Sequence, residues 1–273
     1  MAKAYSGSLL ALCKTIIANR DLVMGLARRE VESRYRGATM GLLWAMLNPL
    51  IMLSVYTFFF TTILKSRWPG IEQSGLDFSL ILFPGLLVFT FFSECVSKAP
   101  ALIVSNQSYV KKIVFPLELL PIISLLGALF HTVIGLLIWA VFFLAIKHHI
   151  YPTSLLVVAP FIPLGLLTLG VSWSLAALGV YVRDITHIVT GLLAALMFLA
   201  PIFYPITAVP ESVRPIIMMN PISVAVEQLR AILYHGQMID WNQWLIYVGI
   251  SILVAWGGLM VFQRARIGFA DVL

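Results

Sequence analysis

The feature that most constrains the fold is a stretch of 24 residues, Gly41–Leu64, that contains no charged side chain. At about 1.5 Å per residue, a helix of this length reaches roughly 36 Å, which is enough to cross the hydrocarbon core of a bilayer. The segment just before it is strongly basic and contains four arginines: Arg28, Arg29, Arg34 and Arg36. The sequence therefore predicts a membrane span with positive charge concentrated at its N-terminal side.

The composition is that of an integral membrane protein. Hydrophobic residues make up 60% of the sequence and charged residues 11%, whereas soluble domains carry about 25% charged residues. No cleavable signal peptide is expected, because Lys14 ends the early apolar run Leu9–Leu12. The net charge of +6 does not indicate a nucleic-acid partner, since the basic residues fall between the apolar segments. Cys13 and Cys95 have no metal-ligand spacing, and neither is expected to form a disulfide.

The apolar segments predict an all-α polytopic membrane protein with six spans. The predicted spans are Gly41–Leu64, Leu76–Ser97, Leu117–Ile146, Ser154–Val182, Ile185–Phe203 and Trp244–Phe262. Placing 1–40, 98–116, 183–184 and 263–273 in the cytoplasm puts 13 of the 18 lysines and arginines there. The positive-inside rule then predicts a cytoplasmic N-terminal segment (1–40), a transmembrane domain (41–262) and a cytoplasmic tail (263–273).

Residues 19–36 predict an amphipathic helix that lies at the membrane interface. At 100° per residue, the charged residues Asp21, Arg28, Arg29, Glu32 and Arg36 share a sector of about 80°, and apolar residues occupy the opposite side. Arg34 points into the apolar sector, where a flat-lying helix lets its side chain extend toward water. In the first span, Pro49 frees the carbonyl of Ala45 and predicts a kink, which serves either packing shape alone or the passage of a substrate.

Two loops are longer than a simple turn requires. In loop 98–116, Ala101–Val110 predicts a short helix parallel to the membrane that docks a cytoplasmic partner; the alternative is a plain connecting loop. In loop 201–243, Asn220 and Pro221 predict the N-cap and first position of a helix ending near Gly236. Residues 222–235 would extend about 21 Å, too short to span, so a re-entrant hairpin is predicted, with a helix on the outer leaflet as the alternative.

The sequence lacks the residues that several functional classes require. No phosphate-binding G-x-x-x-x-G-K-[ST] motif occurs, so this chain is not expected to hydrolyse a nucleotide at a P-loop. Glu94 and Glu118 lie near the cytoplasmic ends of their spans rather than at mid-membrane, where coupling carboxylates of secondary transporters lie. His131 alone is ionisable near the middle of a span, and is interpreted as a packing residue rather than a proton relay. No convergent histidine and carboxylate for catalysis and no metal site are expected.

A series of short motifs, in order along nearly the whole chain, resembles the type-2 ABC exporter permeases of bacterial polysaccharides. The motifs are Arg34-Tyr35-Arg36-Gly37 with Gly41, Leu43-Trp44, Pro49 and Val55-Tyr56; Phe83-Pro84-Gly85-Leu86; Phe92-Ser93-Glu94; Lys111-Lys112-Ile113-Val114-Phe115-Pro116; Arg183-Asp184; Pro201-Ile202-Phe203-Tyr204-Pro205; and Asn220-Pro221. The family includes O-antigen, capsule and teichoic-acid exporters. The resemblance implies a homodimer of six-span subunits in the bacterial inner membrane, two separate ATPase subunits that hold ATP and Mg, and no cofactor on this chain.

The resemblance also implies roles for particular residues. A lipid-linked glycan carries a pyrophosphate, which arginines bind bidentately, so Arg28, Arg29, Arg34 and Arg36 are the candidate headgroup site; the alternative is an anchor to anionic lipid. Aromatic faces that stack on sugars are expected from Tyr56, Phe58, Phe59, Phe60, Phe198, Phe203 and Tyr204, unless these face lipid. Coupling to the ATPase is assigned to Asn106, Gln107, Ser108, Tyr109, Lys111 and Lys112. The outer gate is assigned to Pro205, Asn220, Pro221, Val224 and Glu227.

We interpret the chain as the permease subunit of an ATP-driven exporter of polyprenyl-pyrophosphate-linked polysaccharide, with O-antigen as the expected cargo. One alternative is a permease for a small hydrophobic compound or drug. The other is a lipid-glycan flippase that works without an ATPase.

Overall fold

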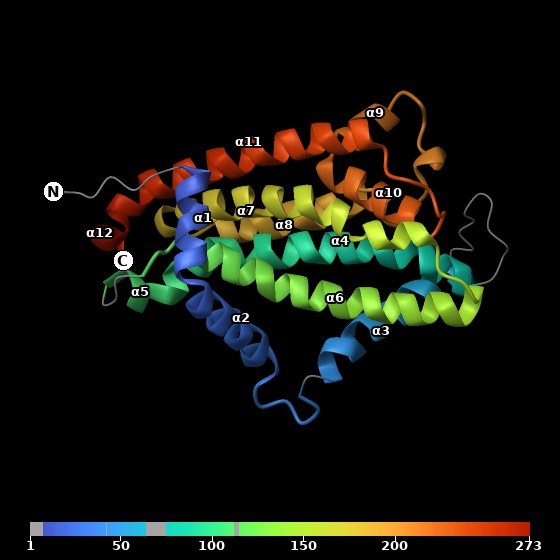
Figure 1. Cartoon of the computed structure of the whole chain (residues 1–273), viewed down its shortest axis with the longest axis horizontal. Coiled ribbons are helices and arrows are strands. Elements are labelled where there is room, and N and C mark those ends of the chain that lie inside the picture. The colour runs from blue at the N-terminus through green and yellow to red at the C-terminus, as the bar shows by residue number, and fades with distance from the viewer. Residues whose placement is uncertain (1–7, 42, 64–74, 112–114) are drawn as a thin grey trace.

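The computed structural model describes residues 8–41, 43–63, 75–111 and 115–273, and this part of the chain is helical without a β-strand. The long helices run side by side along the long axis of the molecule (Figure 1). Helices α5 (Gln107–Lys111) and α12 (Phe269–Val272) lie at one end, here named the α12 end. Helices α9 (Arg214–Met219) and α10 (Pro221–Leu233) lie at the opposite end, here named the α10 end.

Four helices in the described residues are long and apolar enough to cross a membrane. They are α4 (Gly75–Leu102), α6 (Leu119–Lys147), α7 (Val158–Tyr181) and α11 (Trp241–Ala265). Two shorter apolar helices, α3 (Leu43–Phe58) and α8 (Ile185–Leu199), accompany them. The expectation of an all-α polytopic membrane protein is confirmed.

The helices predicted for the first and fifth spans are shorter than their apolar sequences. Helix α3 starts only at Leu43, because Gly41 has a positive φ of 51° in the preceding turn, and its end continues as a π-helical segment (η1, Phe59–Ile63). Helix α8 ends at Leu199, since the next residue, Ala200, precedes Pro201 and is extended. Hydrophobicity alone does not predict where the backbone conformation ends these helices.

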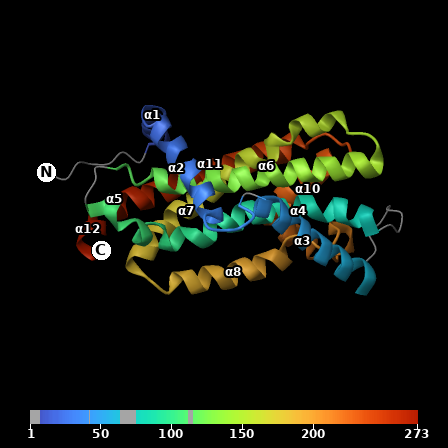
Figure 2. The same cartoon turned by 90° about the horizontal axis from the view of Figure 1, so that it is seen from below.

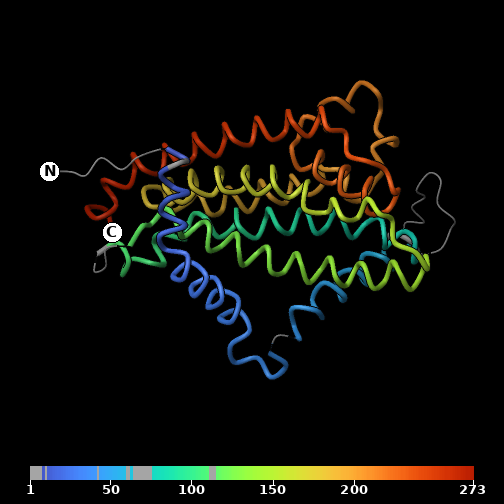
Figure 3. Tube along the Cα trace, in the orientation of Figure 1, coloured from blue at the N-terminus to red at the C-terminus, as the bar shows by residue number. Residues whose placement is uncertain are grey.

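The remaining helices are short, apart from α2, which matches the predicted amphipathic helix. Their bounds are α1 (Leu9–Ala18), α2 (Arg20–Tyr35), η2 (Val104–Asn106), η3 (Pro152–Leu156), η4 (Ile206–Ala208) and η5 (Arg266–Gly268). Helix α2 packs on α6, and the chain then reverses at 36–41 and returns along α3, so that α2 and α3 form a V that projects from the bundle (Figure 3). Helix α1 was not anticipated from the sequence.

Helix α7 is central to the packing. Its contact with α11 is the most extensive between any two of the described helices, and it also packs against α4. Gly170 of α7 and Gly258 of α11 make this approach possible, because a side-chain carbon on either residue would overlap the other helix's backbone. Helices α3 and α8 both contact α4 and lie on the same side of it (Figure 2).

An ion pair closes each end of the bundle. At the α12 end, Arg266 Nη1 lies 2.6 Å from Glu118 Oε2 and its Nη2 donates to the Phe115 carbonyl, which fixes the C-terminal segment to the start of α6. At the α10 end, Lys147 Nζ lies 2.8 Å from Asp77 Oδ1 and joins α6 to α4. The long helices are therefore tied at both ends by charge as well as by apolar packing.

The glycine crossing gives a direct test of the packing. Gly258→Ala should destabilise the protein by at least the 1–3 kcal/mol that is typical of overpacking, because the added methyl meets backbone rather than a movable side chain. Thermal unfolding of the purified protein in detergent measures the change. Gly257→Ala is the matched control, since a side chain there meets nothing within 4 Å. Equal melting temperatures for the two variants would contradict the crossing.

Candidate functional site

A cavity of about 540 Å³ lies beside α3, enclosed mainly by α3, α4 and α6. We name it the central cavity. Its α3 wall includes Trp44, Asn48 and Tyr56, while Arg34 and Tyr35 reach it from α2. It combines charged and polar groups with aromatic and aliphatic walls, so it differs from the purely apolar surface expected of helices that only face lipid.

Three helices bring charged side chains together in this cavity. Arg34 Nη1 of α2 lies 2.5 Å from Glu94 Oε1 of α4, and His131 Nδ1 of α6 lies 3.1 Å from Glu94 Oε2. The Tyr35 hydroxyl is 3.0 Å from His131 Nε2. Arg34 Nη1 also lies 3.2 Å from His131 Nδ1, so that Nδ1 faces both Arg34 and Glu94 while Nε2 faces Tyr35. Burial raises the pKa of Tyr35, which keeps its hydroxyl protonated and able to donate.

Lys98 extends the cluster along α4 toward the α12 end. Its Nζ lies 3.3 Å from Glu94 Oε1 and 3.0 Å from Glu30 Oε1 of α2. Each carboxylate therefore has at least one cationic partner, and the charges of Arg34, Lys98, Glu94 and Glu30 balance. Compensation of this kind is what allows ionised groups to remain inside a membrane protein.

One sequence-based interpretation is wrong at this cluster. His131 is in contact with Glu94 and with the end of α2. A histidine and a carboxylate do converge, although the sequence was interpreted as having no such pair. Along the chain, His131 is 37 residues from Glu94 and 97 residues from Arg34. Only the packing of α2, α4 and α6 therefore brings these side chains together. Among the described residues, no group of three histidines, cysteines or acidic residues is placed to hold a metal ion.

The structure separates the four arginines of the predicted headgroup site. Arg34 pairs with Glu94, whereas exposed Arg28 donates from Nε to Glu32 at 2.7 Å, and that hydrogen bond raises the pKa of Arg28. Arg29 lines a second cavity of about 290 Å³ between α2 and α6. Arg36 is exposed at the C-terminal end of α2. These different environments give the arginines different availability to a phosphate.

The predicted coupling segment is built differently from the expected single helix. Helix α4 continues through Leu102, and η2 and α5 follow as two short pieces. Asn106 Nδ2 donates to the Leu102 carbonyl and Tyr109 stacks on Phe115, and both residues line the second cavity with Arg29. Gln107 and Ser108 are exposed. Lys111 ends α5, its side chain lies outside what is described, and Lys112 is outside the described residues.

Three of the predicted aromatic residues form a connected row. Tyr56 lines the central cavity and lies 5.4 Å from Phe203, which lies 5.9 Å from Phe198 (ring centroids). The Tyr204 hydroxyl donates to the Phe198 carbonyl. Phe58 at the end of α3 and Phe59 at the start of η1 are exposed, and the Phe60 side chain lies outside what is described.

Helix α10 begins as predicted, because the Asn220 side chain accepts from the Ile222 N–H and Pro221 occupies the first position. It ends at Leu233, and Gly236 follows with a φ of 64°. Most of its residues are buried against α4 and α7, including Val224, so it does not lie on the surface. The segment that contains Pro205 leads into it from α8 (Figure 1).

Arg230 of α10 belongs to loop 201–243, where the sequence predicted a re-entrant hairpin. Its side chain is 2% exposed. The guanidinium donates to the carbonyls of Ile81, Pro201 and Ile202, and Nη1 lies 3.0 Å from Glu227 Oε1. Gly85 leaves the space, since a Cβ there would lie 3.0 Å from Arg230 Nη2. Arg230 therefore joins α10 to α4 and to the segment after α8.

Replacement of Arg230 tests this junction. Arg230→Lys keeps the charge but loses the planar fork that reaches three carbonyls, and each buried group left unsatisfied costs about 1–3 kcal/mol. We expect a clear fall in melting temperature, measured by thermal unfolding in detergent. Arg264→Lys on exposed α11 surface is the control and should be neutral. Unchanged melting of the Arg230 variant would refute the junction.

Comparison with known proteins places the chain in a family. Residues 21–234, from α2 to the end of α10, match the ABC-2 type transporter membrane family, and the chain belongs to it. It is 29% identical over 267 residues to the O-antigen export system permease protein RfbA of Myxococcus xanthus, covering 96% of this chain and 99% of that protein. It is 26% identical over 263 residues to a protein of the same name from Klebsiella pneumoniae, covering 93% and 95%. It is 24% identical over 215 residues to the polysialic acid transport protein KpsM of Escherichia coli, covering 78% and 81%. The chain is thus a multi-pass membrane component of an ABC transporter.

Proposed function

We propose that this chain is the permease subunit of an ATP-driven exporter that moves a lipid-linked polysaccharide of the O-antigen type across the bacterial inner membrane. The observation that carries the proposal is similarity over nearly the full length to relatives named as O-antigen export permeases. A central cavity with charged groups, a polar α3 wall and an aromatic row supports it. Two copies of this chain form the membrane unit.

The α12 end faces the cytoplasm in this proposal, with both termini on that side. Of the 18 lysines and arginines, 13 fall on the segments assigned to the cytoplasm. The ATPase is a separate chain present in two copies, since the sequence has no P-loop. Exposed Gln107 and Ser108 on α5 form the docking surface, while Asn106 donates to the Leu102 carbonyl of α4 and Tyr109 stacks on Phe115 before α6.

Arg34 is the residue that exchanges partners during capture of the pyrophosphate. In the structure it is paired with Glu94, so a pyrophosphate must compete with that carboxylate. Glu94 keeps Lys98 and His131 after Arg34 leaves, so its charge stays compensated inside the membrane. Exposed Arg36 meets the headgroup first. The glycan then follows the central cavity past Tyr56 to the outer segment around α10, where Glu227 and Val224 belong to the gate.

Arg34→Lys tests headgroup capture. Lysine keeps the charge but lacks the fork that binds phosphate bidentately, so we expect normal membrane insertion with export reduced several-fold. The readout is surface polysaccharide at matched protein level. Arg20→Lys, on the exposed start of the same helix, is the control. Full export by the Arg34 variant would rule out a specific phosphate contact at this residue.

Gln107→Trp tests the docking surface. A bulky side chain there should impair the fit of the ATPase and uncouple ATP hydrolysis from export, without changing the melting temperature of the permease. Export and ATP hydrolysis are measured together in vesicles. Gln237→Trp, exposed near the α10 end, is the matched control. Normal coupling in the Gln107 variant would place the docking surface elsewhere.

Deletion of this chain in its host tests the function itself. We expect lipid-linked glycan to accumulate on the cytoplasmic face and surface polysaccharide to disappear, with both restored by the wild-type chain. Unchanged surface polysaccharide together with lost efflux of a small hydrophobic compound would favour the drug-exporter alternative. Export that persists without the ATPase or in vanadate would favour the flippase alternative.

A further inference from the structure

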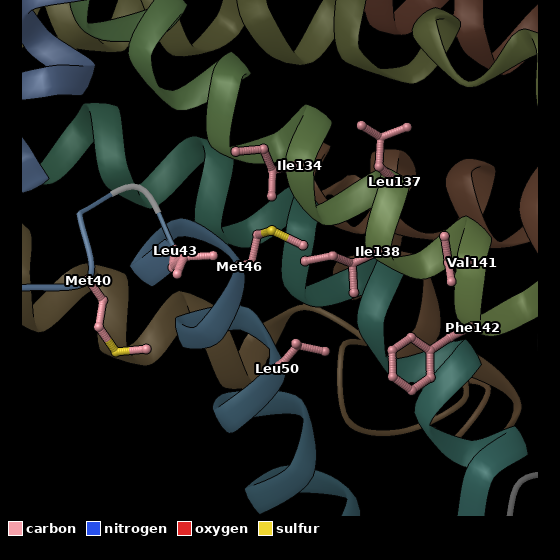
Figure 4. A pocket seen from close by; sticks show the side chains of 9 residues that line it. All are labelled: Met40, Leu43, Met46, Leu50, Ile134, Leu137, Ile138, Val141 and Phe142. Atoms are coloured by element: carbon pink, nitrogen blue, oxygen red, sulfur yellow. The ribbon is translucent and has the colours of Figure 1, made fainter.

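A third concave surface lies on the other side of α3 from the central cavity. It is a groove of about 620 Å³ between α3 and α6 (Figure 4). One wall runs from Met40 to Leu50 and the other from Ile134 to Phe142. Every side chain that lines it is aliphatic, aromatic or a methionine thioether. We name it the α3–α6 groove.

The dimensions of the groove match a lipid chain in one leaflet. Its α6 wall covers nine residues, which rise about 12 Å along the helix. Half of a bilayer core of about 30 Å is close to this length. Met40 and Met46 supply flexible thioethers, which adapt to an irregular chain better than branched side chains do.

Positive charge lies beside one end of the groove. Met40 is in the same turn as exposed Arg36, which carries this positive charge. The Phe142 end lies nearer the end of α6 at Lys147. An amphiphile with a phosphate headgroup and a hydrocarbon tail is complementary to this arrangement, with the phosphate at Arg36 and the tail along the groove.

Helix α3 separates two unlike surfaces. Met46 and Leu50 face the α3–α6 groove, while Asn48 and Tyr56 line the central cavity. A lipid-linked glycan has the same division, with an apolar chain on one side of a phosphate and sugars on the other. We propose that the α3–α6 groove binds the polyprenyl chain of the lipid-linked substrate while the glycan occupies the central cavity. This inference rests on the proposed function.

Photolabelling tests the site. The purified full-length chain is placed in proteoliposomes of phosphatidylethanolamine and phosphatidylglycerol with a polyprenyl pyrophosphate that carries a diazirine in its chain. Mass spectrometry should find labels concentrated on 40–50 and 134–142, and unlabelled polyprenyl pyrophosphate should reduce them several-fold. A diazirine-tagged phosphatidylglycerol is the comparison probe.

Three variants make the result specific to the groove. Leu137→Trp fills the groove and should lower labelling several-fold, whereas Leu253→Trp on α11 should not. The two leucines are matched, since they are 62% and 65% exposed and both lie on membrane-length helices. Arg36→Gln should also lower labelling by the pyrophosphate probe, but not labelling by the corresponding polyprenol.

Four outcomes would overturn the inference. Labels spread evenly over the exposed apolar faces would mean that the probe reports bulk lipid. Equal labelling by tagged phosphatidylglycerol, without competition by polyprenyl pyrophosphate, would assign the groove to a bilayer phospholipid. Cross-linking of Leu137→Cys to a second copy of the chain would assign it to a subunit interface. Glycan export with an unlabelled groove would overturn the inference alone, while a labelled groove without glycan export would overturn only the proposed function.

Discussion

The ion-pair network around Glu94 is the interaction on which the arrangement of the membrane helices depends. Its side chain is 9% exposed, and it contacts Arg34 from α2, Lys98 from its own helix and His131 from α6. A carboxylate inside a membrane protein is costly unless it is compensated, so Glu94 must keep at least one cationic partner at all times. The network therefore fixes α2 against α4 and α6. Because α3 follows α2 through a short turn, its position sets both the central cavity and the α3–α6 groove.

Arg230 plays the corresponding part at the α10 end. It satisfies three backbone carbonyls that the bend after α8 and the proline-containing α4 present to the interior. Both buried networks join segments that are far apart in the chain, but they differ in kind. The Glu94 network contains exchangeable ion pairs, whereas Arg230 mostly binds backbone. The first is suited to a change of partners when a phosphate arrives, and the second to holding α10 in place.

Local sequence rules were sufficient wherever a structure depends on neighbouring residues. Asn220 and Pro221 start α10 as predicted because the capping hydrogen bond and the fixed φ of proline are local properties. The amphipathic pattern of 19–36 likewise became α2. The rules failed for α8, because the apolar sequence continues beyond the end of the helix at Leu199. They also failed for 101–110, because α4 extends to Leu102.

The sequence by itself determined the class of the protein, since long uncharged segments can only be helices that satisfy their backbone within a membrane. It also supplied the family motifs and the positions of the basic residues. Only the tertiary structure decided which charges meet. His131 has a carboxylate partner, Arg34 is paired with Glu94, and Arg230 is buried against α4 and the segment after α8. These contacts depend on the rotation and depth at which separate helices pack, and no pattern within one helix encodes either quantity.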